Sequence, residues 1–385
     1  MGRIFFGSVS FVRTKEMNSP IKGEKHSLIQ EKHRKEQEMK MKPNDSVTAI
    51  KWKNDRLSLL DQRRLPDKVV WLDITNTEQT VSAIRDMVVR GAPAIGITAA
   101  YGFAMATRLR YEESPDNWQT SIQSDLELLR DARPTAVNLV WAINRMLGVF
   151  ERVDGDPVPL LLDEAKAIHE EDITANHRMG ELGAELITPG KGVLTHCNAG
   201  SLATGGYGTA LGVIRSAWQQ KRINAVYADE TRPWLQGARL TAWELIEDGI
   251  PTSLVVEGAA SALMASGRIG WIIVGSDRIA ANGDVANKIG TCNLAIIAHY
   301  YGVKFMVVAP VSTCDPNMAS GQDIPLESRD PDEILSLGEQ RIAAAQASAW
   351  NPVFDITPAT LIDVIVTEKG VVREPNVEKM RVLWG

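Results

Sequence analysis

Hydrophobic and polar positions follow two different patterns along the chain, and the pattern changes near residue 188. Short apolar runs predict a hairpin over 47–52 and 56–60 and a further strand over 69–72. Helical spacing then predominates and predicts helices over 77–90, 95–109, 115–148 (broken at 133–134) and 159–187. We therefore expect a mainly helical domain over 47–188 that begins with a small antiparallel sheet.

Beyond Pro189, short apolar strands alternate with helical patterns. Strands are predicted at 193–194, 225–227, 253–256, 271–274 and 304–309, with helices between them. This alternation is typical of a parallel sheet with helices on both faces, so the predicted fold class is α/β. Ligands of such sheets bind beyond the carboxyl ends of the strands, so functional side chains are expected in the loops that follow them.

Residues 1–46 differ from the rest of the chain. They carry ten Lys/Arg against six Asp/Glu, whereas the remaining residues carry 32 against 42. The segment is polar and charge-mixed, without the continuous apolar region of a secretory signal. We interpret residues 1–46 as a disordered extension.

Composition narrows the function classes. The net charge of −6 disfavours a general nucleic-acid binder, and no apolar run approaches the roughly 18 residues that a membrane helix needs. Three cysteines are too few for a disulfide framework and lack paired zinc-ligand spacing. We expect a soluble protein of a reducing compartment, such as the cytoplasm, that handles a small molecule.

The loop after the first predicted parallel strand contains Cys197, followed by a glycine-rich turn and a helix. A cysteine near the positive end of a helix favours the thiolate, although a lone cysteine is more often a buried core residue. The next loop, from Asp229 to Gln236, is equally well explained as a helix-capping cluster or as part of a site.

Two further loops follow the strand at 271–274. Asp277 comes directly after this apolar strand, where desolvation would raise its pKa and suit it to general acid catalysis; an N-cap or an ion pair with Arg278 is the alternative. Asn282-Gly283 predicts a tight turn, and Lys288, just before a helix, suits a phosphate.

In the first half, Arg90-Gly91-Ala92-Pro93 and Arg133-Pro134 each precede a helix and would suit an anion, although helix caps often look alike. We interpret His169-Glu170-Glu171-Asp172 as a solvated helix face rather than a metal site. Cys292 is expected in the core, and Cys314 in an exposed polar loop.

Taken in order, these loops carry a specific resemblance. The stretches 90–96, 195–200, 230–233 with 236–241, and 275–278 with 287–291 resemble the methylthioribose-1-phosphate isomerase family, from about Val47 to the C-terminus. This family shares a superfamily with the α, β and δ subunits of translation initiation factor 2B. The resemblance implies a helical N-terminal domain and a Rossmann-like catalytic domain over 189–385.

The resemblance also implies a function. The family interconverts 5-methylthioribose 1-phosphate and 5-methylthioribulose 1-phosphate in methionine salvage, as a homodimer and without a metal or nucleotide cofactor. Its catalytic cysteine and acid fall on Cys197 and Asp277. Its substrate-binding positions fall on Arg90, Gly91, Ala92, Arg133, Gln236, Asn287 and Lys288.

Two alternatives remain at this point. One is the same chemistry on another pentose 1-phosphate, such as ribose 1,5-bisphosphate or 5-deoxyribose 1-phosphate. The other is a non-catalytic regulatory subunit of the initiation-factor type, against which the presence of both Cys197 and Asp277 argues. The route of the C2 hydrogen, as a proton or as a hydride, is also undecided.

Overall fold

The computed structural model describes residues 47–133 and 136–383, so the predicted disordered extension over 1–46 lies outside the described residues. The chain begins with a three-stranded antiparallel sheet of β1 (Ile50–Lys53), β2 (Arg56–Leu60) and β3 (Trp71–Ile74). The predicted hairpin is confirmed by the pairing of β1 with β2. The third strand lies two residues later than predicted.

Six helices follow this sheet: α2 (Thr77–Arg85), α3 (Ala92–Glu113), α4 (Trp118–Ser121), α5 (Gln123–Arg130), α6 (Val137–Phe150) and α7 (Val158–Glu185). Helix α2 begins as predicted, with the Asn76 side chain accepting a hydrogen bond from the backbone of Gln79. The prediction that it continues to Arg90 is wrong. Met87 has a left-handed backbone with φ of 58°, which no α-helix accommodates.

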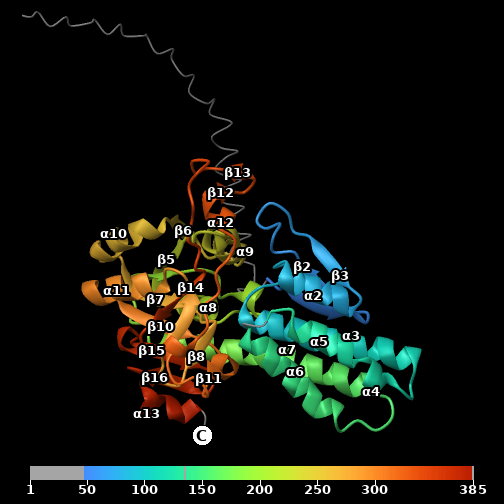
Figure 1. Cartoon of the computed structure of the whole chain (residues 1–385). Coiled ribbons are helices and arrows are strands. Elements are labelled where there is room, and N and C mark those ends of the chain that lie inside the picture. Colours follow the sequence, from blue (N-terminus) through green and yellow to red (C-terminus); the bar gives the residue numbers. More distant parts are fainter. Residues whose placement is uncertain (1–46, 134–135, 384–385) are drawn as a thin grey trace, which may run out of the picture. The chain divides into compact units, whose positions relative to one another are not determined.

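The larger sheet contains seven strands: β4 (Lys191–Thr195), β5 (Ile223–Asp229), β6 (Thr252–Val255), β7 (Ile269–Val274), β10 (Lys304–Val308), β15 (Val364–Thr367) and β16 (Gly370–Arg373). Their order is β16-β15-β10-β7-β4-β5-β6, and only β16 pairs antiparallel (Figure 1). The six parallel strands thus follow the Rossmann order 3-2-1-4-5-6. In this order the connections reverse direction between β4 and β7, which is where such sheets bind ligands.

Helices cover both faces of this sheet, as the strand pattern predicted. Val193 packs with the end of α7, α8 (Ala210–Gln219) and α9 (Ala242–Glu247). Its neighbour Leu194 points to the other face, with α10 (Ala260–Ala265), α11 (Thr291–Tyr301) and α13 (Val377–Met380). Because successive side chains of a strand alternate between faces, strands buried on both sides read as continuous apolar runs.

The helix α7 belongs to two hydrophobic cores. Its first half packs with the N-terminal helices through Leu161, Ala165 and Ile168, and its second half packs on the sheet through Met179 and Ala184. The helix is therefore shared by the N-terminal helices and the larger sheet. The domain boundary at residue 188 stays a prediction, and it falls just after this helix ends.

Several short elements were not predicted. A second small sheet has the order β11-β8-β9-β14 and consists of β8 (Arg278–Ala280), β9 (Val285–Lys288), β11 (Cys314–Asp315) and β14 (Phe354–Thr357). The remaining elements are α12 (Asp332–Leu335), β12 (Ser336–Leu337), β13 (Gln340–Arg341), the π-turn η2 (Gly237–Thr241) and the 3₁₀ turns η1 (Ser201–Ala203), η3 (Glu257–Ala259), η4 (Val311–Thr313), η5 (Gly321–Asp323), η6 (Ala359–Leu361) and η7 (Arg381–Leu383). Strands of two to four residues are too short to show a period in the sequence.

Candidate active site

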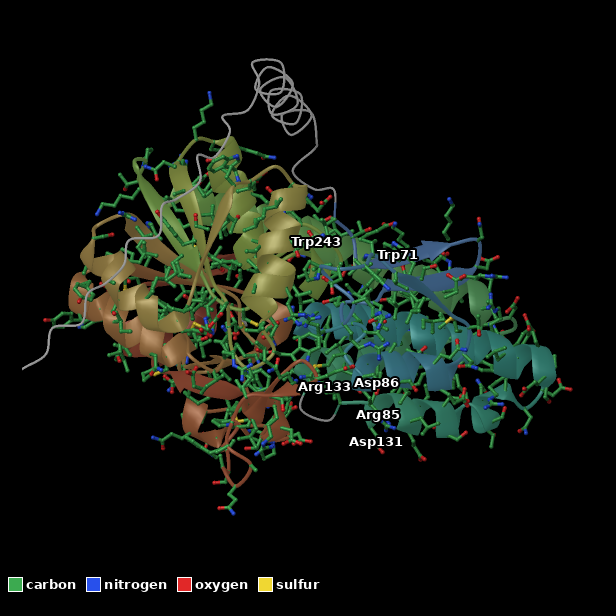
Figure 2. The ribbon with its side chains drawn as sticks, turned by 90° about the horizontal axis from the view of Figure 1, so that it is seen from above. Trp71, Arg85, Asp86, Asp131, Arg133 and Trp243 are labelled. Atoms are coloured by element: carbon green, nitrogen blue, oxygen red, sulfur yellow. The ribbon has the colours of Figure 1, made fainter. Side chains whose placement is uncertain are left out.

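A cleft lies beyond the carboxyl ends of β4 and β7. The start of α3 and the small sheet also line it. Figure 2 places Arg133 where the N-terminal helices meet the larger sheet. The cleft brings together eight of the predicted site residues: Arg90, Gly91, Ala92, Arg133, Cys197, Gln236, Asp277 and Lys288. Asn287 lines an adjoining cavity that Cys197 and Asp277 also reach.

Cys197 follows β4 in a strained backbone conformation. Its φ of 61° is left-handed, which costs a residue with a side chain about 1–2 kcal/mol. Two threonines hold this conformation. The Thr231 hydroxyl accepts a hydrogen bond from the Cys197 amide at 2.9 Å, and the Thr241 hydroxyl donates one to the Cys197 carbonyl. Cys197 as a whole is 8% exposed and lines the cleft, so this conformation directs the residue toward the site rather than the core.

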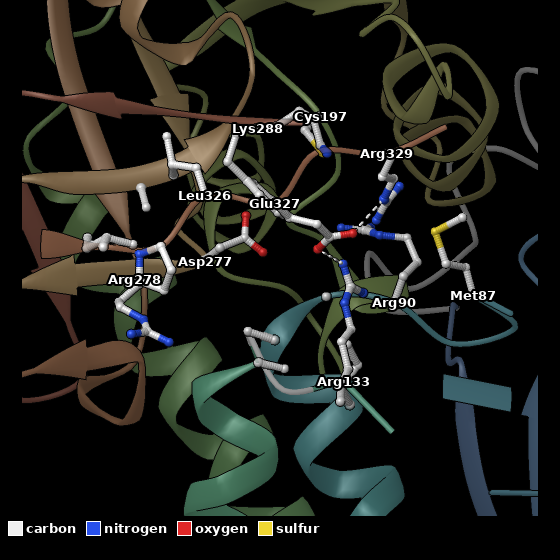
Figure 3. Close-up of a pocket in the computed structure, with 18 of the residues that line it drawn as sticks. Met87, Arg90, Arg133, Cys197, Asp277, Arg278, Lys288, Leu326, Glu327 and Arg329 are labelled. Carbon is white, nitrogen blue, oxygen red and sulfur yellow. Dashed lines mark hydrogen bonds and ion pairs between the residues drawn. The ribbon is translucent and has the colours of Figure 1, made fainter. Parts of the chain in front are cut away.

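The positive neighbour of Cys197 differs from the one predicted. The helix expected close behind the cysteine, α8, begins only at Ala210. Lys288 takes this role instead, because the two groups are close enough for the charge of Cys197 to raise the pKa of Lys288. In Figure 3 both side chains point into the same part of the cleft.

Asp277 connects β7 to β8, and its backbone amide donates to the carbonyl of Ala286 at 3.0 Å. The expected apolar surroundings lie beneath it, where Ile272 and Val274 face the core. The carboxylate itself is partly exposed in the cleft, and its charge acts on Lys288 and Arg133. The strand pattern predicted that the Asp277 carboxyl group is desolvated, but in the open cleft this group is partly exposed to solvent.

The first turn of α3 forms one wall of the cleft. Gly91 is its N-cap, with φ of 93°, and an added Cβ would lie 2.5 Å from Ala203 Cβ, so glycine is required here. The amides of Ala92 and Ala94 have no carbonyl one turn earlier to bond, because they begin the helix. Such amides, together with the helix dipole, favour an anion.

Arg90 precedes this turn, and both terminal nitrogens of its guanidinium donate hydrogen bonds. It donates to the Asn198 side-chain oxygen at 2.7 Å and to the Asn198 carbonyl at 2.9 Å. The Asn198 side chain in turn donates a hydrogen bond to the Glu244 carboxylate, which also accepts hydrogen bonds from the backbone amides of Ser201 and Leu202. The loop that carries Cys197 is thus built around one buried carboxylate.

Lys288 ends β9 and is 5% exposed. Its ammonium lies 4.5 Å from the centre of the Phe354 ring. Burial, together with the nearby Arg329 and Arg90, lowers the pKa of Lys288 to about 8, against the opposing effect of Cys197 and Asp277. A buried lysine without a carboxylate among the described residues within 4 Å is well suited to an anionic ligand.

The two predicted amide side chains differ in their bonding. Gln236 is buried, and its side-chain oxygen accepts no hydrogen bond from any described residue. Asn287 donates to the Thr291 hydroxyl at 3.0 Å. A buried acceptor without a donor is costly, so a ligand hydroxyl would satisfy Gln236.

Leu326, Glu327, Arg329 and Phe354 are among the cleft residues that the sequence did not predict. Glu327 accepts from Arg329 Nε at 2.9 Å, and its other oxygen lies 3.6 Å from Arg133 (Figure 3). These residues belong to irregular chain beyond β11 or to the short strand β14. The sequence there reads as a charge-mixed surface loop and offers no signal of a site.

The motif His169–Asp172 was interpreted as a solvated helix face, which is correct for its two glutamates and wrong for His169 and Asp172. Glu170 and Glu171 are exposed, but His169 Nε2 lies 3.0 Å from the Gly205 carbonyl, and Asp172 accepts the Gly205 amide at 2.7 Å. These contacts attach the glycine-rich loop to α7. Within residues 47–133 and 136–383, no group of three or more His, Cys, Asp or Glu side chains is placed to hold a metal ion.

The other cysteines lie outside the cleft. Cys314 was expected to be exposed but is buried at 7%, because it pairs in β11 with β8. Cys292 is partly exposed at the start of α11. All three cysteines are free. In the part of the chain that the structure covers, no helix is long and apolar enough to cross a membrane.

Known proteins resemble the chain over most of its length. The sequence profile of the Initiation factor 2 subunit family matches residues 88–374. Methylthioribose-1-phosphate isomerase from Alkalilimnicola ehrlichii is 63% identical over 334 residues, which cover 87% of this chain and 96% of that protein. The enzyme of the same name from Pseudomonas aeruginosa is 56% identical, with 88% and 96% coverage.

Two solved structures are similar at the same level of identity. The 5-methylthioribose 1-phosphate isomerase from Pyrococcus horikoshii has a TM-score of 0.84 and 40% identity, covering 90% of this chain and 99% of its own. A structure described as translation initiation factor eIF-2B subunit delta from A. fulgidus has a TM-score of 0.79 and 40% identity, covering 88% and 100%.

Proposed function

The chain belongs to the Initiation factor 2 subunit family, and we propose that within it this protein is the isomerase that converts 5-methylthioribose 1-phosphate into 5-methylthioribulose 1-phosphate in methionine salvage. One observation carries the proposal. The Cys197 and Asp277 side chains line one cleft, and one wall of that cleft is a helix N-terminus flanked by an arginine.

The substrate poses a specific chemical problem. Its anomeric oxygen carries the phosphate, so the ring cannot open to a free aldehyde as in ordinary aldose isomerases. The C1–O4 bond must break, O4 must gain a proton, and the C2 hydroxyl must lose one. The C2 hydrogen must also move to C1. The product is a ketone at C2, with the phosphate still on C1.

Asp277 would donate the proton to O4 and afterwards accept the proton of the C2 hydroxyl, which returns the carboxyl to its starting state. Binding of the sugar would displace water from the partly exposed carboxylate and supply the desolvated setting that the open cleft lacks. Cys197, beside Lys288, would act on C2 as a thiolate base or stabilise positive charge at C1.

The phosphate would bind at the amides of α3 with Arg90 and Lys288, while Arg133, Gln236 and Asn287 contact the sugar or its phosphate. These roles follow from charge and position. Cations and helix amides would recognise the dianion, and the buried Gln236 oxygen would accept a hydrogen bond from a sugar hydroxyl.

A direct assay tests this function. Purified protein is incubated with methylthioribose 1-phosphate carrying deuterium at C2, and the ketose is followed by NMR. We expect turnover; deuterium at C1 supports a hydride shift, and its replacement by hydrogen from water supports a base. No turnover, together with tight binding to a translation GTPase complex, would instead favour the regulatory-subunit function.

We also infer that the protein works as a homodimer in the cytoplasm. The family resemblance supports the dimer. The three free cysteines support a reducing compartment, since the proposed chemistry needs an unoxidised thiol. Sedimentation at micromolar concentration tests the dimer, and a single monomeric species would contradict it.

Lys288 should give the reaction a pH limit on the alkaline side. Its pKa of about 8 means that the ammonium is present below this pH and lost above it, while the substrate phosphate, with a second pKa of about 6, is a dianion on both sides of pH 8. We expect kcat/KM to fall as the pH rises through about 8. Lys288→Ala should raise KM roughly tenfold to a hundredfold with a smaller effect on kcat.

The pH profile of kcat/KM between 6 and 10 checks this prediction, because it reports the free enzyme. Lys288→Arg keeps its charge at every pH and should lose the decline. Lys304→Ala, at an exposed lysine on β10, is the control and should keep the wild-type profile. A flat wild-type profile to pH 10 would contradict the role of Lys288.

A further inference from the structure

A carboxylate lies inside a cleft that is otherwise prepared for an anion. Five cationic side chains line it, namely Arg90, Arg133, Arg278, Lys288 and Arg329, against the two carboxylates Asp277 and Glu327. Asp277 has a proposed role in proton transfer, whereas Glu327 has none. Because a carboxylate near a phosphate site weakens phosphate binding, its presence needs a reason.

Glu327 is held firmly in this position. One oxygen accepts from Arg329 Nε at 2.9 Å, and the guanidinium of Arg133 lies 3.6 Å from the other. These arginines hold the pKa of Glu327 below its usual range, against the opposing effect of burial. The residue is therefore an anion at neutral pH, and Figure 3 shows its carboxylate and that of Asp277 directed into the same space.

The second oxygen of Glu327 has unused bonding capacity. Oε2 is buried, yet it accepts no hydrogen bond from the described residues, since Arg133 is too distant for one. A carboxylate oxygen can only accept hydrogen bonds when ionised. It is satisfied by a donor such as a sugar hydroxyl, and it repels a phosphate dianion, which is itself an acceptor.

The charge of the cleft points the same way. The lining cations exceed the carboxylates by three, but Asp315 pairs with Arg278 at 3.6 Å and Glu333 approaches Arg329 at 4.0 Å from outside the cleft. Counting these two carboxylates leaves an excess of one positive charge, which falls well short of the roughly four negative charges of two phosphates.

Building on the proposed function, we propose that Glu327 determines substrate specificity: its free oxygen binds a sugar hydroxyl and its charge excludes pentoses with a second phosphate. This would separate a 5-methylthio or 5-deoxy pentose 1-phosphate from ribose 1,5-bisphosphate. Specificity of this kind needs a repulsive element as well as an attractive one, and Glu327 supplies both.

The test measures binding, so it does not depend on turnover. Titration calorimetry compares 5-deoxyribose 1-phosphate with ribose 1,5-bisphosphate, which differ only at C5. Wild-type protein should bind the monophosphate more tightly. In Glu327→Gln the ratio of the two dissociation constants should shift toward the bisphosphate by about tenfold or more, since one like charge has been removed.

Glu333→Gln is the matched control. It removes the same charge and also approaches Arg329, but its side chain does not line the cleft. Its ratio should stay within about twofold of the wild type, because a partly exposed ion pair at 4.0 Å contributes little. An equal shift in both variants, or wild-type protein that binds the bisphosphate as tightly as the monophosphate, would overturn the proposal.

Two further readings separate the possible failures. A thermal melt of Glu327→Gln shows that the variant is folded; if it is not, the wild-type preference alone decides. Turnover of methylthioribose 1-phosphate is measured in parallel. Turnover with an unchanged binding ratio would reject the specificity role alone, whereas no turnover would reject the proposed function.

Discussion

Replacing Cys197 with serine should reduce turnover by at least about a thousandfold while the fold is retained. The substitution changes sulfur to oxygen at nearly constant volume, so the left-handed backbone and its two threonine contacts should persist. A serine hydroxyl is a much weaker acid and a weaker nucleophile than a cysteine thiol, so it cannot replace the thiol in the reaction. The loss should appear in kcat, since the reacting group is changed and the phosphate contacts are not.

Cys292→Ser provides the comparison. Cys292 is also a free cysteine but lies at the start of α11 and does not line the cleft. It should retain activity within about threefold of the wild type, as surface substitutions usually do. Steady-state kinetics and a thermal melt of both variants check the prediction. Near-normal kcat in Cys197→Ser would remove the thiol from the mechanism.

Replacing Asp277 with asparagine should also reduce turnover by about a thousandfold or more. The amide has the shape of the carboxyl group but cannot give a proton to O4 or take one from the C2 hydroxyl. Binding should change less than kcat, and in the direction of tighter phosphate binding, because a negative charge that acts on Lys288 and Arg133 is removed.

Asp315→Asn is the matched control for this variant. Asp315 pairs with Arg278 at 3.6 Å but does not itself line the cleft. It should keep kcat within several fold, which isolates the effect of a carboxylate at the reacting centre. Titration with 5-deoxyribose 1-phosphate gives the affinity of Asp277→Asn. A variant with wild-type kcat would contradict the acid role.

Much of the fold could be predicted from the sequence because its signals are local. Strand β2 has the predicted bounds, and the strands β4, β5, β7 and β10 lie where apolar runs indicated. The hairpin β8–β9 and the elements after residue 310 were missed, because strands of two to four residues show no period.

The candidate site divides in the same way. Cys197 and Asp277 could be placed together in advance, since the carboxyl ends of neighbouring parallel strands meet at one edge of the sheet. The helix predicted to polarise Cys197 lies too far along the chain, and the carboxyl of Asp277 meets cations rather than an apolar wall. In both cases the position of the residue in the cleft was predicted correctly, and the groups that surround it were not.

The order of apolar and polar residues by itself determined the α/β class, the parallel sheet and the loops that carry a thiol, a carboxyl and an anion-binding turn. The tertiary structure alone decided the partners of these groups: it buried Lys288 beside Cys197 and brought Glu327 between Arg133 and Arg329. The physical reason is range. A strand or helix is encoded by residues a few positions apart, whereas burial and charge pairing depend on segments that meet only after the chain has packed.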